Sequence, residues 1–141
     1  MNINLDLVDD FQHQYGEQKT FESALDFMFE YACQIRIALP PIAARTFEIS
    51  KRSRQGTATP EERNKIVADT WKFISEQKAW GDSSPEYCIM RGMAFLMQDE
   101  PGPGEERISE LISWFLFYVN KFEDHSDNSA ALIQRYFGHS T

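Results

Sequence analysis

Apolar residues recur every three or four positions along most of the chain, which is the spacing of one face of an α-helix. In the segment from Thr20 to Leu39, the apolar positions with this spacing are Phe21, Leu25, Met28, Ala32, Ile35 and Leu39. No segment shows the sustained alternation of apolar and polar residues that marks a half-buried strand. The pattern therefore predicts an all-α fold.

Helix start and stop signals divide this pattern into six or seven helices. Pro40 and Pro41 end one helix and suit the first turn of the next, and Gly16 and Gly56 stand where helices are expected to end. The expected helices are residues 6–15, residues 20–39, a third that ends at Gly56, a fourth that begins at Thr59, a fifth that begins at Ser84, residues 105–122 and a short terminal helix capped by Asp127 or Asn128. We expect them to form a single-domain bundle over residues 1–141.

Local side-chain signals mark some of these positions more sharply. Thr59, Pro60 and Glu62 have the spacing of a capping box with proline in the first helical position, and Thr20 is a good N-cap residue. Gly92 lies inside a predicted helix, where it costs about 1 kcal/mol relative to alanine, so we interpret it as a point of close contact between helices. The expected inner face of the helix that follows Thr59 is Ile66, Val67, Thr70, Trp71, Phe73 and Ile74.

With 141 residues, 42% of them apolar, the chain is long enough for one domain with a sizeable core. Its apolar runs fall well short of the ~20 residues that a membrane-spanning helix needs. The first residues, MNINLDLVDD, lack the basic start and apolar core of a signal peptide, so we expect a cytoplasmic protein without a membrane partner. Cys33 and Cys88 lie among apolar residues and are expected to be buried thiols.

The net charge of −8 is distributed unevenly along the chain. Residues 1–30 carry seven acids and one base, whereas residues 31–65 carry seven bases and three acids. An acidic chain is a poor general binder of nucleic acid, because phosphates repel it, and it is suited to bind a basic protein. The alternative is that the charge only keeps the protein soluble.

Glu22, Asp26 and Glu30 follow one another at intervals of four residues, which places three like charges in one row on a helix. Each neighbouring pair repels by about a few tenths of a kcal/mol, so we expect cations on a partner or elsewhere in this chain to neutralise the row. The basic cluster KRSR of the next helix offers an internal answer. In an antiparallel hairpin, Arg54 would lie near Glu22 or Asp26, and Lys51 near Asp26 or Glu30.

The sequence carries no HExxH, paired CxxC, Walker or GxSxG motif. The one polar cluster that suggests a metal is FEDHSDN, which contains Glu123, Asp124, His125 and Asp127. Nearly consecutive side chains in a loop point apart instead of converging on an ion, so a loop that leads into a helix N-cap is the better interpretation. We therefore expect no enzymatic activity, no cofactor and no metal site.

The predicted helix over residues 105–122 contains the run WFLFYV and is apolar on most sides. Trp114, Phe117 and Tyr118 give this helix more apolar surface than one buried face needs. An exposed remainder would pair with a second copy of the chain. This leads to one possible function, an oligomeric structural or regulatory helical protein, with a homodimer as its simplest form.

The segment from Phe21 to Ile74 resembles a family of small all-helical bacterial proteins. The resemblance is carried by FMFEYACQIRIALPPIAARTFEISKRSRQG and VADTWKFI: a helix that ends at Leu39 and Pro40, a second helix, a turn with Gly56, and a helix with Trp71. Relatives of such proteins include immunity proteins of bacterial polymorphic-toxin and secretion systems. The resemblance transfers no functional residue to this chain.

Small size, acidity, missing catalytic motifs and this resemblance together favour a binding function. The hypothesis is an immunity protein that is steered by charge to a cognate basic toxin or effector and sterically blocks its active site. The candidate contacts are Glu22, Asp26, Glu30, Asp99, Glu100, Glu105 and Glu106. If the KRSR cluster neutralises the row on the helix, the acidic loop over residues 99–106 is the better candidate.

Overall fold

The computed structural model describes residues 5–78, 84–100 and 107–138, and in this part it contains seven α-helices, two short 3₁₀ helices and no strand. The α-helices are α1 (Asp6–Tyr15), α2 (Glu17–Ile35), α3 (Pro41–Arg54), α4 (Pro60–Lys78), α5 (Pro85–Ala94), α6 (Ile108–Phe122) and α7 (Ser126–Phe137). The 3₁₀ helices are η1 (Arg36–Ala38) and η2 (Phe95–Met97). The prediction of an all-α bundle of six or seven helices is confirmed.

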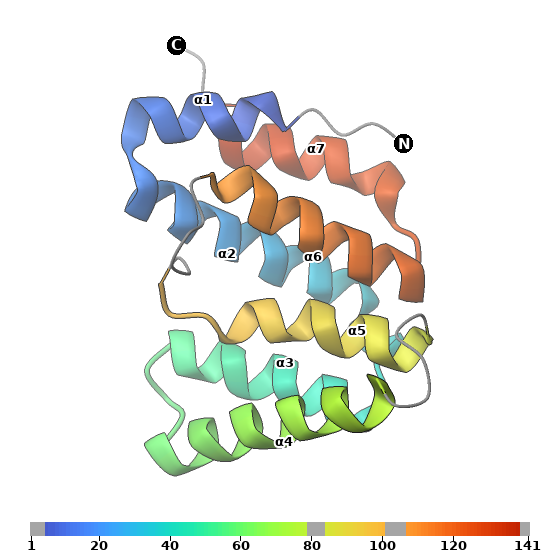
Figure 1. The fold of residues 1–141 in the computed structure, drawn as a ribbon. Helices are drawn as coiled ribbons and strands as arrows, with labels where there is room; N and C mark the ends of the chain where they lie inside the picture. Colours follow the sequence, from blue (N-terminus) through green and yellow to red (C-terminus); the bar gives the residue numbers. More distant parts are fainter. Residues whose placement is uncertain (1–4, 79–83, 101–106, 139–141) are drawn as a thin grey trace.

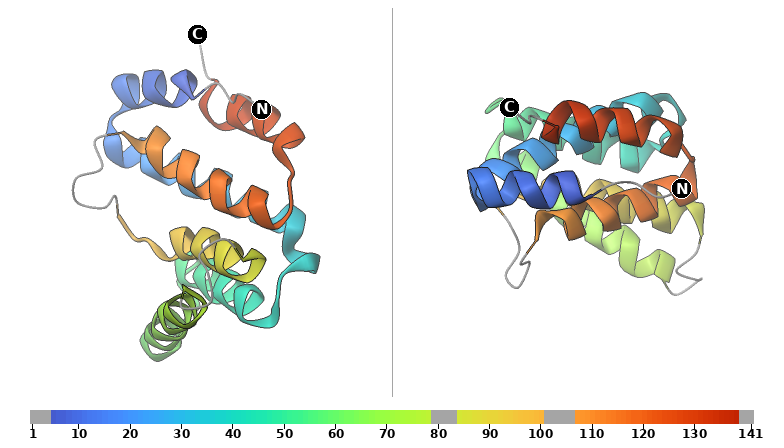
Figure 2. Two further views of the ribbon diagram at one scale, coloured as in Figure 1. Left: turned by 45° about the vertical axis from the view of Figure 1, so that its right-hand side comes forward. Right: turned by 90° about the horizontal axis from the view of Figure 1, so that it is seen from above.

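The helices are arranged in successive layers (Figure 1). α1 and α7 lie side by side at one end, and α2 and α6 lie next to them. α3 and α5 form the following layer, and α4 closes the far end by packing against both. The left view of Figure 2 shows the same order, with α6 between α5 and the pair of α1 and α7.

The buried apolar side chains form one cluster to which all seven α-helices contribute. Phe27, Met28 and Tyr31 of α2 are fully buried in it, and the ring of Tyr31 meets that of Phe115 edge to face. The hydroxyl of Tyr31 donates to Oδ1 of Asn120 at 2.5 Å, so its polar end is satisfied inside the core. Burial raises the pKa of this phenol.

Gly92 of α5 is buried against α6. A Cβ atom on this residue would lie only 2.5 Å from Cγ2 of Val119, well inside contact distance. The absence of a side chain therefore lets the two helices approach each other, as the sequence predicted. Cys88, on the same helix, is buried as expected, whereas Cys33 is only half-buried.

The predicted capping box begins α4. The N–H of Glu62 donates to Oγ1 of Thr59 at 3.1 Å, and the N–H of Thr59 donates to Oε1 of Glu62 at 3.0 Å. Pro60 occupies the first helical position, where its missing N–H has no cost. Before it, Gly56 takes a φ of 76° and ends α3 in the left-handed conformation that suits glycine.

The prediction that Thr20 caps α2 is wrong, because α2 begins at Glu17. Gly16 adopts a φ of 90°, which lets α1 end and α2 begin within one residue. Thr20 then lies in the first turn of the helix, where its buried hydroxyl donates to the carbonyl of Gly16 at 2.6 Å. The α-helix also ends earlier than the predicted end at Leu39, because α2 stops at Ile35 and residues 36–38 form a 3₁₀ turn before the two prolines.

None of the described helices combines the length and the apolar character that crossing a membrane requires. The fold therefore presents one apolar cluster wrapped by seven amphipathic helices. Some large apolar side chains lie outside that cluster and are exposed.

Candidate protein interface

Two carboxylates of the acidic row on α2 form ion pairs with arginines of two other helices. Arg54 of α3 lies 2.7 Å from a carboxylate oxygen of Asp26, as the sequence predicted. Glu30 pairs instead with Arg135 of α7 and accepts a hydrogen bond from the hydroxyl of Tyr136. Glu22 is exposed and has no ion-pair partner among the described residues.

The pKa of the Tyr136 phenol is affected by its burial and by the negative charge of the row. Its partial burial, the hydrogen bond to Glu30 and the negative charge of that carboxylate together raise the pKa of the phenol to about 12. The hydroxyl therefore stays protonated and donates to the carboxylate at neutral pH. The row is thus largely a packing feature that joins α2 to α3 and α7.

The other bases of the KRSR cluster, Lys51 and Arg52, form no ion pair with the acidic row among the described residues. Lys51 forms no ion pair among the described residues, so its position near Asp26 or Glu30 stays a prediction. Both terminal nitrogens of Arg52 donate hydrogen bonds to the carboxylate of Glu62, at 2.9 and 3.0 Å, and so stabilise the capping box of α4. The same hydrogen bonds lower the pKa of Glu62.

The acidic loop is only partly described. Asp99 lies 2.5 Å from a guanidinium nitrogen of Arg63 on α4 and is therefore paired within the chain. Glu100 is exposed and has no ion-pair partner in the described part of the molecule. Glu105 and Glu106 lie outside the described residues. Among the predicted acidic contacts in the described part, Glu22 and Glu100 are thus the carboxylates free to meet a partner.

A second surface lies on α4 and α6 and consists of Trp71, Trp114, Phe117 and Tyr118, which we call the aromatic surface. Trp114 is 54% exposed, Phe117 47% and Trp71 46%. The ring of Trp114 stacks on Tyr118 at 6.1 Å between centroids and meets Phe117 edge to face at 5.6 Å. The prediction that α6 carries more apolar surface than it buries is confirmed.

Two cations are held against the aromatic surface. The guanidinium carbon of Arg91, on α5, lies 5.1 Å from the ring centroid of Tyr118 and 6.0 Å from that of Trp71, so it links the α4 and α6 parts. The ammonium of Lys121 lies 4.8 Å from the ring centroid of Phe117. Neither cation has an ion-pair partner among the described residues. All three distances lie within the range of cation–π attraction.

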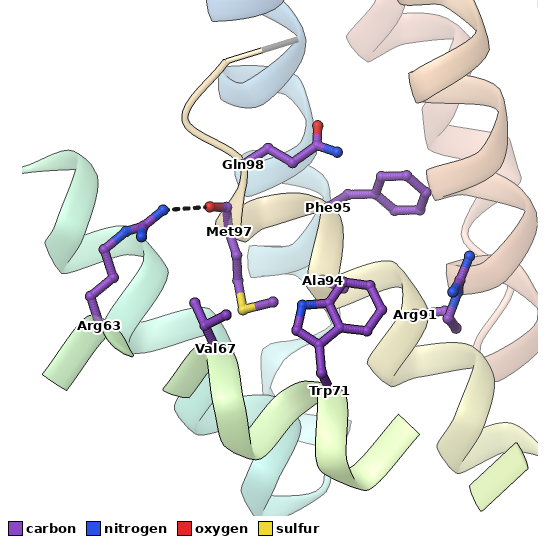
Figure 3. A pocket seen from close by; sticks show the side chains of 8 residues that line it. All are labelled: Arg63, Val67, Trp71, Arg91, Ala94, Phe95, Met97 and Gln98. Atoms are coloured by element: carbon purple, nitrogen blue, oxygen red, sulfur yellow. Dashed lines mark hydrogen bonds between the residues drawn. The ribbon is translucent and has the colours of Figure 1, made fainter. Parts of the chain in front are cut away.

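A groove of about 340 Å³ continues the aromatic surface between α4 and α5 (Figure 3). Its apolar lining consists of Val67, Trp71, Ala94, Phe95 and Met97. Arg63 stands at one end of the groove and Arg91 at the other, while Gln98 borders it beside Phe95 (Figure 3). Arg63 is occupied, since it donates to the carbonyl of Met97 at 2.9 Å and pairs with Asp99. The lining offers apolar contact and N–H donors, and those of Arg91 form no ion pair with any residue that the structure describes.

Sequence reasoning found the α6 part of this surface but missed Trp71 and Arg91. Trp71 was expected on the inner face of α4, yet it is nearly half exposed because α4 lies at the edge of the bundle and has neighbours on one side only. Periodicity defined the apolar stripe of the helix but not how much of it other helices cover. The sequence around Trp71 gave no signal for Arg91, because Arg91 comes from another helix.

The segment FEDHSDN leads into a helix, as predicted. The N–H of Ser126 donates to the carboxylate of Asp124 at 2.8 Å, which lowers the pKa of that group. α7 accordingly begins at Ser126, before the predicted cap at Asp127 or Asn128. Within the described ranges, no group of three His, Cys, Asp or Glu residues is arranged to hold a metal ion.

No protein-family model matches this chain, and no curated protein or solved structure matches it. The resemblance to small helical bacterial proteins therefore stays a prediction from the sequence. The geometry of the chain's own surfaces is the basis for any functional proposal.

Proposed function

We propose that this protein is a protein-binding module and, more narrowly, an immunity protein that binds a cognate toxin or effector and occludes its active site. The observation that carries this proposal is the aromatic surface. Of its three large aromatic side chains that are about half exposed, Trp114 and Phe117 contact each other, and Arg91 links Trp71 to Tyr118 beside them. Contiguous exposed apolar groups of this kind favour association, because leaving them in water costs free energy.

The composition of this surface is that of an interface centre. Tryptophan, tyrosine and arginine are the residue types that most often dominate binding energy. Here Arg91 of α5 lies against the rings of both Trp71 of α4 and Tyr118 of α6. Because the arginine is stacked between rings, its ordering is largely complete before a partner arrives. The surface is therefore preorganised for binding.

The immunity role is supported by the sequence resemblance and by the net charge of −8. Glu22 and Glu100, which have no ion-pair partner in the described part, would contribute to steering a basic toxin toward the protein. In this proposal the charge guides the encounter, and the aromatic surface supplies most of the affinity.

The test is co-expression in a bacterial host with the genes that flank the coding sequence. We expect one flanking product to arrest growth when it is produced alone and to be harmless when this protein is produced with it. The two proteins should then co-purify. The proposal fails if neither flanking product is toxic, or if growth stays arrested in the presence of this protein.

A matched pair of variants ties the effect to the surface. Trp71→Ala and Trp114→Ala remove half-exposed rings from the aromatic surface, so we expect them to weaken protection without unfolding the bundle. Ile37→Ala removes an apolar side chain that is 96% exposed on η1 and is not one of the residues of that surface, so it should protect like the parent protein. Equal protection by all three variants would remove the aromatic surface from the proposal.

The second candidate is an oligomeric structural or regulatory protein in which the aromatic surface meets a second copy. The observation that favours it is the exposure of Trp114 and Phe117 on a single helix. Light scattering over a wide concentration range decides between the two candidates. A dimer that Trp114→Ala converts to a monomer would support the second, and a strict monomer would exclude it.

A further inference from the structure

We propose that the groove between α4 and α5, together with the aromatic surface, binds an amphipathic segment of the partner protein that carries a carboxylate beside a large apolar side chain. The apolar side chain enters the groove, and the carboxylate binds Arg91. This inference rests on the proposed function and specifies the partner's chemistry at that surface.

The groove sets the apolar requirement. Its sides are formed by Val67 and Trp71 from α4 and by Ala94, Phe95 and Met97 from α5 and η2. A volume of about 340 Å³ holds one or two large side chains rather than an extended ligand. The methionine adapts its shape to the occupant, since its side chain is unbranched and flexible.

Arg91 sets the requirement for a carboxylate. The rings of Trp71 and Tyr118 lie against its guanidinium, at 6.0 and 5.1 Å, which leaves the N–H donors at the edges of the plane. Planar N–H pairs match the two oxygens of a carboxylate and bind them through charge-assisted hydrogen bonds. No carboxylate of the described residues occupies this position, and the groove lining contains none.

The remaining charges favour the same kind of partner. Lys121 adds a second cation at the far side of the aromatic surface, over Phe117. Glu110, the one acidic residue of α6, is engaged by Arg107 at 3.6 Å. The aromatic surface therefore carries local positive charge on a protein whose net charge is −8.

This charge pattern argues against a second copy as the occupant. A two-fold dimer through the aromatic surface would bring Arg91 and Lys121 of both copies into one interface and would add no carboxylate from that surface. A partner that is basic overall but presents one acidic and apolar segment satisfies both the long-range charge of the protein and the local charge of the surface. We therefore assign the site to such a segment.

The experiment selects peptides from a random display library on the immobilised full-length protein, with the Trp71→Ala/Arg91→Ala double variant as counter-selection. We expect the enriched peptides to share an acidic residue next to tryptophan, phenylalanine or leucine. Enrichment of basic or uncharged peptides would overturn the proposal, and so would the absence of any peptide that distinguishes the two proteins.

A binding cycle isolates the carboxylate contact. The best peptide and its amide counterpart, with Glu replaced by Gln, are measured by fluorescence anisotropy against the parent protein and Arg91→Ala. We expect the parent to bind the amide peptide about tenfold more weakly than the acidic one, and Arg91→Ala to bind both peptides alike. A tenfold preference that survives in Arg91→Ala would place the carboxylate elsewhere.

Arg36→Ala is the matched control, because Arg36 is an exposed arginine on η1 with no ion-pair partner among the described residues. It should bind like the parent protein. If Arg91→Ala does not fold, as judged by circular dichroism, the comparison of acidic and amide peptides on the parent protein still decides the question. Equal affinity for both peptides would then refute the role of a carboxylate.

Other occupants of the surface give distinct results. A dimer that Trp114→Ala dissolves would place a second copy on the surface, and binding of an oligothymidylate that Trp71→Ala abolishes would place a nucleic acid there. Either result overturns the inference. Growth protection that depends on Trp71, combined with selected peptides that lack acids, would leave the proposed function standing and would reject the acidic segment alone.

Discussion

Replacing Gly92 with alanine tests the contact between α5 and α6 directly. The new methyl group would lie 2.5 Å from Cγ2 of Val119, a distance that real Cβ atoms do not occupy. Val119 is fully buried and β-branched, so its side chain has few other rotamers available in a helix. One of the two helices must therefore move.

The size of the effect follows from two opposing contributions. Overpacking a core by a methyl group costs about 1–3 kcal/mol, with the upper part of that range expected for a stiff neighbour. Alanine favours the helix over glycine by about 1 kcal/mol. We expect Gly92→Ala to lower the free energy of unfolding by about 1–2 kcal/mol.

A double-mutant cycle separates the two contributions. In a Val119→Ala background the clash is gone, so Gly92→Ala should raise the free energy of unfolding by about 1 kcal/mol, the helix preference alone. Urea unfolding followed by circular dichroism measures all four proteins. The reasoning is refuted if Gly92→Ala has the same effect in both backgrounds, or if it stabilises the parent protein.

Three further predictions concern charged and hydrogen-bonded groups. The hydrogen bonds from Arg52 lower the pKa of Glu62, so the ionised carboxylate contributes stability above about pH 4.5, and this contribution is lost as the pH falls through the lowered pKa. Glu62→Gln keeps the cap but lacks the charge. The variant should therefore be less stable than the parent protein in urea unfolding at neutral pH, and the difference should vanish at low pH. The pKa of Tyr136 is raised to about 12, so the free energy of unfolding should fall as the pH rises from 10 to 12. In urea unfolding, Tyr136→Phe should lack the part of this decrease that comes from the phenol. Asp26→Asn breaks an exposed ion pair and should change the free energy of unfolding by less than about 1 kcal/mol, whereas a larger loss would show that the row is a major source of stability.

The parts of this fold that the sequence predicted are those determined by nearby residues. The capping box at Thr59 and Glu62 joins residues three apart, and the left-handed glycine at position 56 needs only its own backbone. Thr20 shows the limit of such reasoning. Its side chain suits an N-cap, but Gly16 allows an earlier start, and the hydroxyl finds a carbonyl within the helix instead.

The interface was harder to predict because its residues come from three helices. Trp114 and Phe117 stood out on one helix with more apolar positions than one face can bury. Trp71 did not, since its exposure depends on α4 lying at the edge of the bundle. The partner of Glu30, Arg135, is far away in the sequence and belongs to a helix that no local pattern places beside α2.

The central claim is that the partner covers the aromatic surface. Fluorine NMR tests it on protein labelled with fluorotryptophan, in which the resonances of Trp71 and Trp114 are assigned by replacing each with phenylalanine. The binding partner is an inactive variant of the flanking gene product that the co-expression test identifies as the toxin, and calorimetry confirms that the complex has formed. We predict that both resonances shift on binding, and two unchanged resonances in a saturated complex would contradict the claim.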